Sequence, residues 1–264
     1  MKKLILLFML ITSLMFAQNQ TSNTKYNFNV TNDLTVGGDL SVTGSSTAHA
    51  DIYFNSNGTA QTPVANDTIG VTLFTEGDLS GFTFDAGESG TFTGTADNGG
   101  DITITCGGAH TVDVGDWIVI SQASSNGSYD IDGVFQVTAD GGTTFDITFA
   151  DWDASETGVW QSPSQLTLSQ VGFSNSTFRV DWNISASVAG TPAGDQVIWG
   201  CYVNGMYQVN TMQQRTLSTG SVYGSFGNGG FVTLTTGDEI FMFFLSDDVN
   251  ALTHKLGTLR VEQL

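Results

Sequence analysis

The segment Thr177-Phe-Arg-Val-Asp-Trp-Asn-Ile-Ser185 alternates apolar and polar side chains along its whole length. Successive side chains of a β-strand point to opposite faces, so this alternation predicts a strand with one buried and one solvated face. Further along, the run Val197-Ile-Trp-Gly-Cys-Tyr-Val203 leads into Asn204-Gly205. An Asn-Gly pair between apolar runs is the strongest short signal of a β-hairpin. Both segments favour an antiparallel, all-β domain.

The run Glu239-Ile-Phe-Met-Phe-Phe-Leu245 is apolar on both faces, and Phe241, Phe243 and Leu245 form the second one. A strand of a two-layer sandwich needs only one apolar face. The second face therefore requires either a partner subunit or a further layer of structure, and we expect a subunit contact.

Residues 88–163 differ from the segments on either side in their pattern of strand-like runs. They hold about five short strand patterns of their own, enough for a small β-barrel. The alternating texture of residues 48–87 returns at residues 164–264. We therefore predict an all-β chain in which one sandwich, formed by 48–87 and 164–264, is interrupted by an inserted barrel at 88–163. Such an insertion is tolerated because the termini of a small module often lie close together.

Three tandem hexads precede the sandwich: Asn27–Asn32, Asp33–Gly38 and Asp39–Gly44. The second and fourth residue of each is apolar, so these side chains share one face of an extended chain. A single ribbon cannot bury such a face alone, which predicts that residues 18–47 form the stalk of an oligomer. The candidate oligomer contacts are Leu34, Val36, Leu40, Val42, Phe241, Phe243 and Leu245.

The first 17 residues have the composition of a secretory signal. Lys2 and Lys3 precede an apolar run from Leu4 to Phe16, and Ala17 supplies a small residue at the end. The run is short for a membrane span. Met15 fits the cleavage pattern poorly, which leaves an uncleaved anchor as the alternative. We expect export to a virion surface, a cell surface or the extracellular medium.

The charge balance limits the partners. The 264 residues carry a net charge of −19 with only seven Lys and Arg, which argues against nucleic acid, because phosphate contacts need clustered basic residues. Ca²⁺ would suit an acidic surface, but the segment Ser128–Gly133 lacks the later Glu of an EF-hand loop. We expect no cofactor. Two distant cysteines, Cys106 and Cys201, are expected to be buried free thiols.

Catalytic patterns are weak in this sequence. The three histidines, His49, His110 and His254, lie in separate segments without a metal-binding spacing. Among 26 acidic residues any two could be nominated as a glycosidase pair, so that signal has no specificity. Aromatic residues beside Gly, Asn and Asp suit sugar binding, although barrel cores contain the same residues. The candidate receptor contacts are Tyr207, Tyr223, Phe226 and Asn228.

The C-terminal half resembles the C1q/tumour-necrosis-factor-like jelly roll found at the tips of phage and marine viral fibres. The resemblance rests on the order of four elements. They are the Phe178–Ile184 strand, the Val203-Asn204-Gly205 turn, the Leu234-x-x-Gly237-Asp238-x-Ile240 corner and the closing Leu259-x-Val261-x-x-Leu264. The segment from Ala48-x-x-Asp51-Ile-Tyr53 to Gly81-Phe-Thr-Phe84 is similar to the opening strands of the same domain.

The inserted segment resembles a small β-barrel module of phage structural proteins. Its matching elements are Ile102–Thr105, His110, Val114-Gly115-Asp116, Gly133–Thr138 and Thr143–Ile147, although Thr111-Val112-Asp113 replaces the Gly-Leu usual after the His. The hexads resemble the repeats of trimeric viral fibre shafts. Together these resemblances imply a homotrimeric fibre or spike subunit of a virion. Its head would bind a host glycan or protein receptor, and it would also contact other virion proteins.

Two further hypotheses stay open. A bacterial secreted or cell-surface adhesin of the same architecture would explain the signal segment directly. A secreted glycan-active enzyme is a minor alternative, and we expect no enzymatic activity. The virion and adhesin hypotheses predict the same architecture and differ in the neighbouring genes. Capsid or portal genes would favour the virion protein, and secretion genes would favour the adhesin.

Overall fold

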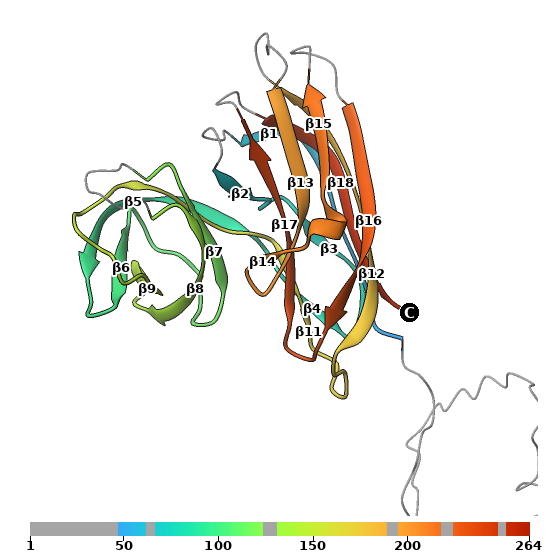
Figure 1. Cartoon of the computed structure of the whole chain (residues 1–264), viewed down its shortest axis with the longest axis horizontal. Coiled ribbons are helices and arrows are strands. Elements are labelled where there is room, and N and C mark those ends of the chain that lie inside the picture. The colour runs from blue at the N-terminus through green and yellow to red at the C-terminus, as the bar shows by residue number, and fades with distance from the viewer. Residues whose placement is uncertain (1–46, 62–66, 124–130, 189–194, 218–223, 248–251) are drawn as a thin grey trace, which may run out of the picture. The chain divides into compact units, whose positions relative to one another are not determined.

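The computed structural model describes residues 47–61, 67–123, 131–188, 195–217, 224–247 and 252–264. Within these ranges the chain consists of β-strands and one short 3-10 helix, η1 (Val209–Thr211), so the predicted all-β class is confirmed (Figure 1). The signal segment and the hexads, with Leu34, Val36, Leu40 and Val42, lie outside the described residues.

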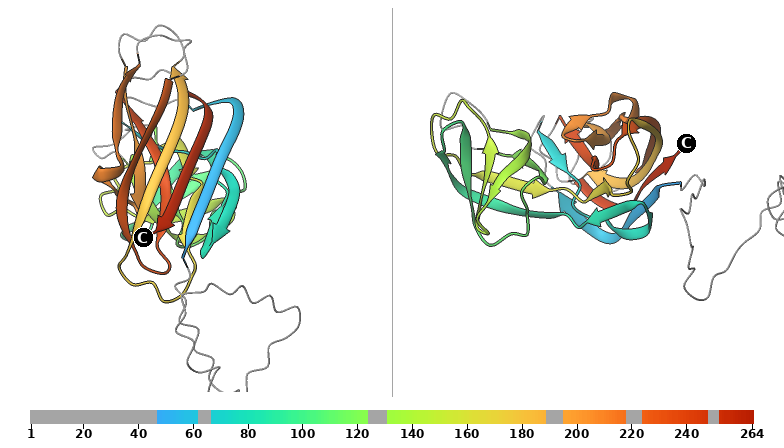
Figure 2. Two further views of the ribbon diagram at one scale, coloured as in Figure 1. Left: turned by 90° about the vertical axis from the view of Figure 1, so that its right-hand side faces the viewer. Right: turned by 90° about the horizontal axis from the view of Figure 1, so that it is seen from below.

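Five strands form the first sheet of the sandwich, which we call sheet A. In spatial order they are β16 (Gly224–Leu234), β12 (Ser176–Val188), β18 (Leu252–Gln263), β1 (His49–Gln61) and β3 (Thr75–Ser80). The left view of Figure 2 shows them side by side. All neighbours are antiparallel. Alternate residues of β12 from Phe178 to Ile184 are buried, as the sequence pattern predicts.

The second sheet, sheet B, covers the inner face of sheet A. Its path is β14 (Met206–Tyr207), β13 (Asp195–Val203), β17 (Glu239–Ser246), β11 (Gln165–Leu168) and β4 (Phe82–Asp85), with β15 (Gln213–Leu217) and β2 (Thr68–Gly70) pairing beside it. The consecutive strands β16, β17 and β18 alternate between the two sheets, as expected for a β-sandwich. Side chains of both sheets form one core that includes Ile52, Trp182, Trp199, Phe244 and Leu259.

The inserted segment folds as a closed six-stranded barrel. Around the barrel the strands are β10 (Gly158–Ser162), β5 (Glu88–Asp97), β6 (Asp101–Cys106), β9 (Thr144–Thr148), β8 (Gly133–Asp140) and β7 (Trp117–Ser121). The pairing of β7 with β10 closes the ring, which removes free strand edges. The barrel has its own core, which includes Phe92, Ile104, Ile118, Phe145 and Trp160.

The chain leaves the sandwich and returns to it at two strands that pair with each other. β4 ends at Asp85, which lies opposite Gln165 at the start of β11. The hydroxyl of Ser164 accepts hydrogen bonds from the amides of Phe74 (3.1 Å) and Gly87 (3.2 Å) and so ties the two crossings together. The barrel is therefore an insertion between neighbouring strands, at the place where the texture of the sequence changes.

The Asn204-Gly205 pair makes the predicted hairpin between β13 and β14. Both residues have positive φ, 46° and 70°, which Asn and Gly tolerate best. The Asn204 side chain donates to the carboxylate of Asp238 (2.8 Å) and accepts from the amide of Glu239 (2.9 Å). A Cβ on Gly205 would lie 2.1 Å from the ring of Trp117, so the turn packs directly against the barrel.

Candidate binding surfaces

The four predicted receptor contacts fall in different environments. Tyr207 is 57% exposed on β14, and Asn228 is half-buried on β16. Tyr223 lies outside the described residues. Phe226 is buried, with its ring stacked on Trp199 at a centroid distance of 4.5 Å. This finding corrects the prediction for Phe226, which occupies an inward position of its strand and belongs to the core.

Tyr207 stands in a short segment of exposed apolar side chains, Met206–Asn210, which we call the apolar ridge. Met206 is 72% exposed and Val209 is 70% exposed. The polar side chains of Gln208 and Asn210 alternate with them in β14 and η1. Several large apolar groups exposed together on a structured segment mark an interaction surface.

Buried hydrogen bonds hold the backbone of the apolar ridge in place. The amide of Gln208 donates to the carbonyl of Cys201 at 2.8 Å. The buried hydroxyl of Thr211 accepts from the amide of Cys201 at 3.0 Å, and the carbonyl of Thr211 accepts from the indole of Trp182 at 2.8 Å. The exposed side chains therefore project from a rigid base, which lowers the entropic cost of binding.

The second apolar face of β17 is covered by the barrel. Phe241 and Phe243 are buried and form a cluster with Tyr202. Trp117 of β7 and Val134 of β8 pack against this cluster. The sequence pattern required either a partner subunit or a further layer of structure over this face of β17. The structure shows a further layer, which the barrel of the same chain provides. The subunit contact expected at these two phenylalanines is thus replaced by an intramolecular contact.

Leu245, the third residue of that predicted contact, is half-buried near the end of β17. It pairs with Ile198 of β13 on one side and with Thr68 of β2 on the other. Leu245 is therefore in an inner strand of sheet B.

Carboxylates gather where the barrel meets the sandwich. Burial, together with the nearby negative charges of Asp116 and Asp85, raises the pKa of Glu239 to about 7. Burial also raises the pKa of Asp116. Within the described ranges no ion pair reaches Glu239, and its Oε2 is buried without a hydrogen-bond partner. Glu239 is therefore partly protonated at neutral pH, where an ordinary Glu is ionised.

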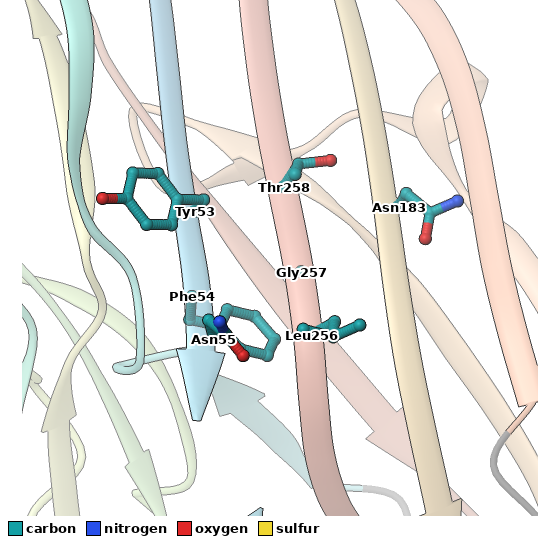
Figure 3. A pocket seen from close by; sticks show the side chains of 7 residues that line it. All are labelled: Tyr53, Phe54, Asn55, Asn183, Leu256, Gly257 and Thr258. Carbon is teal, nitrogen blue, oxygen red and sulfur yellow. The ribbon is translucent and has the colours of Figure 1, made fainter. Parts of the chain in front are cut away.

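A groove of about 370 Å³ lies on sheet A, on the side that faces away from the core (Figure 3). Its exposed lining comes from three adjacent strands: Tyr53 and Asn55 of β1, Leu256 and Thr258 of β18, and Asn183 of β12. The phenyl ring of Phe54 fills the space that a side chain on Gly257 would take, since a Cβ there would lie 2.1 Å from the ring. Tyr53 is 47% exposed and Leu256 is 48% exposed.

The sequence analysis missed this groove. One feature of the sequence could have indicated it. Large apolar residues occupy outward positions of strands whose alternate residues point into the core. Tyr53 stands between the buried residues Ile52 and Phe54, and the neighbour of Leu256, Gly257, is buried too. A pattern of this kind identifies an exposed residue, but it does not reveal which outward residues of other strands lie beside it.

The buried titratable groups have packing roles. The side chain of His110 is enclosed by the rings of Phe145 and Trp160, and His254 packs against Phe54 and Phe244. Burial lowers the pKa of His254 to about 4. Cys106 and Cys201 are buried free thiols, as expected. In the part of the chain that the structure describes, no group of three His, Cys, Asp or Glu side chains is placed to hold a metal ion.

Among the described residues, no helix has the length and apolar character needed to cross a membrane. Comparison of the sequence with protein-family models and with curated proteins finds no match.

Proposed function

We propose that the protein is a surface-displayed attachment protein. In this proposal it is a homotrimeric fibre or spike subunit of a virion, and its β head binds a host-cell receptor, with glycans as the receptor class. The observation that carries the proposal is the apolar ridge. There the exposed ring of Tyr207 lies in the same segment as Gln208 and Asn210, on a backbone fixed by buried hydrogen bonds. The side-chain amide nitrogens of Gln208 and Asn210 donate to the carbonyls of Met206 and Phe231, which holds these two side chains in place. Large apolar side chains that are exposed together on a structured segment are typical of an interaction site.

The charge and the expected assembly support the same proposal. A net charge of −19 disfavours anionic partners and keeps a displayed protein soluble. A shallow, exposed ridge gives weak single-site binding, which three linked copies strengthen through avidity. The hexads upstream of the head supply the expected reason for three copies to stay together.

A bacterial cell-surface adhesin of the same architecture is the second candidate, favoured by the signal-like residues 1–17. Antibody labelling separates the two candidates. Labelling of purified virions supports the first, and labelling of the envelope of the producing cell supports the second. Neither candidate involves enzymatic turnover, so incubation with host polysaccharide is expected to release no product.

A binding assay with the full chain tests the receptor proposal. We expect binding to host cells and to a subset of immobilised glycans, and we expect Tyr207→Ala to weaken it about fivefold, because an aromatic contact contributes on the order of 1 kcal/mol. Val171→Ala is the matched control, since Val171 is an exposed apolar residue outside the apolar ridge. No binding by the wild type, or equal loss in both variants, would overturn the proposal.

A further inference from the structure

We propose that the inserted barrel carries a second binding site, which takes a ligand with a primary ammonium group. The site is a groove of about 270 Å³ on the barrel, which we call the barrel groove. Its polar lining consists of Thr103 of β6, Asp140 of β8, and Thr144 and Asp146 of β9. The apolar ridge belongs to the sandwich, so this inference does not depend on the function proposed above.

The strand pairing of the barrel brings hydroxyl and carboxylate groups together in this groove. Thr103 lies opposite Asp146 across β6 and β9. The two neighbours of Asp146 in β9 are buried, so its own side chain points away from the barrel core. On the other side of β9 the register with β8 shifts between Val137 and Ala139, which indicates a β-bulge. Bulges re-aim side chains and are frequent at barrel rims and beside active sites.

Each carboxylate of the barrel groove is held through one of its oxygens. The backbone amide of Gly142 donates to Oδ1 of Asp140 at 2.8 Å. The side-chain amide of Asn98 donates to Oδ2 of Asp146 at 2.8 Å. Among the described residues, no hydrogen bond engages the second oxygen of either carboxylate. Both side chains therefore offer an acceptor in a fixed orientation, which lowers the entropic cost of binding.

A buried histidine stands behind the wall of the barrel groove. The side chain of His110 is fully buried, and neither ring nitrogen has a hydrogen-bond partner within the described ranges. Its Nε2 lies 3.8 Å from Oδ1 of Asp140, and its ring packs against Phe145, which also lines the groove. Buried polar groups are normally hydrogen-bonded, so packing alone does not account for this imidazole. Because it is aimed at a carboxylate of the groove, it marks a site whose polar contacts a ligand completes.

The charge of the barrel selects a cationic ligand. Residues 88–163 contain twelve Asp and Glu residues and no Lys or Arg. The carboxylates of the groove therefore have no basic side chain of their own module to pair with. An uncompensated negative potential attracts cations and repels anions, and a concave site concentrates it. Sulfated, phosphorylated and carboxylated ligands are disfavoured here.

The groups in the groove suit an ammonium better than a metal ion or a guanidinium. The three donors of an ammonium match two carboxylate oxygens and a threonine hydroxyl. Ca²⁺ takes about six to eight oxygen ligands, and no group of three His, Cys, Asp or Glu side chains in the described ranges is placed to hold a metal ion. A guanidinium binds best to both oxygens of one carboxylate. Here one oxygen of each is already bonded.

The test is a titration of the full chain with two small amines, followed by the NMR shifts of its backbone amides. Glucosamine represents an amino sugar, and a lysine amide blocked at its α-amino group represents a protein side chain. The shifts of wild-type Thr103, Gly141 and Asp146 should move with the amine, whether or not any variant folds. The N-acetylated form of each probe should not bind, because it lacks the charge. Salt at about 150 mM screens charges more than roughly 8 Å away.

Two substitutions in the groove should weaken binding. Asp140→Asn and Asp146→Asn each remove one charge and keep an oxygen for the bond from Gly142 or Asn98. Each should lower the affinity about tenfold, because a hydrogen bond between charged groups is lost. Asp151→Asn is the matched control. It removes the same charge from an exposed position outside the groove and should leave the affinity unchanged.

Each outcome supports or overturns the inference. Binding of glucosamine alone would place the ammonium on a glycan, and binding of the lysine amide alone would place it on a protein, and both support the site. Equal binding of the acetylated probes, equal weakening by Asp151→Asn, or no shift at the groove with either amine would overturn it. Ca²⁺ that displaces the amine from the same residues would assign the groove to a metal ion and overturn it too. Loss of receptor binding in Tyr207→Ala, with amine binding unchanged, separates this site from the apolar ridge.

Discussion

The two outer faces of the sandwich differ in whether their apolar side chains are covered. On sheet B, Phe241 and Phe243 are buried under the barrel of their own chain. On sheet A, Tyr53 and Leu256 stay half exposed around a groove. An apolar sheet face is a liability until something covers it. The comparison teaches that one strand with two apolar faces does not by itself indicate an oligomer, because an inserted module can supply the second layer.

The largest expected effect separates two phenylalanines, one on each face. Phe241→Ala should lower the free energy of unfolding by about 3–5 kcal/mol, because it removes a fully buried ring. Phe231→Ala should change it by about 0.5 kcal/mol or less, because that ring is exposed. Urea denaturation measures both. Equal losses would mean that the barrel does not protect its face.

A smaller effect concerns His254, which lies in the core under the exposed face. Its pKa is lowered to about 4 in the folded chain, against an ordinary value of 6.5. As the pH falls below about 6.5 the unfolded chain takes up a proton first, so stability is lost between pH 6.5 and pH 4. The loss is about 3 kcal/mol if the full shift applies. Urea midpoints at pH 7.5 and 4.5 should diverge less in His254→Leu than in the wild type.

The junction under the covered face has the opposite pH dependence. The pKa of Glu239 is raised to about 7 from 4.5, so its ionisation opposes folding as the pH rises through 7. Glu239→Gln should stabilise the chain by about 1 kcal/mol at pH 8, a figure reduced for partial exposure. At pH 4 the two should be nearly equal. Glu76→Gln, which removes one carboxylate from an exposed position of β3, is the control.

The smallest effect is a rate rather than a free energy. Cys201 lies in the sandwich core and Cys106 in the barrel core, and burial raises their pKa values to about 12 and about 11. Neither thiol should react with a thiolate-specific reagent at pH 8 in the folded chain, and both should react in urea. Rapid labelling of Cys201 alone would show that the sandwich opens more readily than the barrel.

Local sequence patterns were sufficient to predict the strands, but they did not predict which segments pack on the faces of these strands. The alternation around Trp182 and the Asn204-Gly205 turn predicted their strand and hairpin, because side-chain period and positive φ are properties of the local chain. Phe226 was misplaced because glycines surround it, which suggests a loop, whereas the residue pairs with Ile184 inside a sheet. The groove at Tyr53 and the barrel contact at Phe241 join segments that are distant in sequence, and no periodicity records such neighbours.

The site of the insertion has a consequence for how this head can be rearranged. Since Asp85 and Gln165 already face each other in paired strands, a tight turn could join β4 to β11 and leave the barrel out. The shortened head would keep its own hydrogen bonds but would present Tyr202, Phe241 and Phe243 to water. The barrel is thus the cover of this apolar cluster. An exchange of this domain between proteins would have to transfer the barrel and β17 together, because the barrel covers Phe241 and Phe243 of β17.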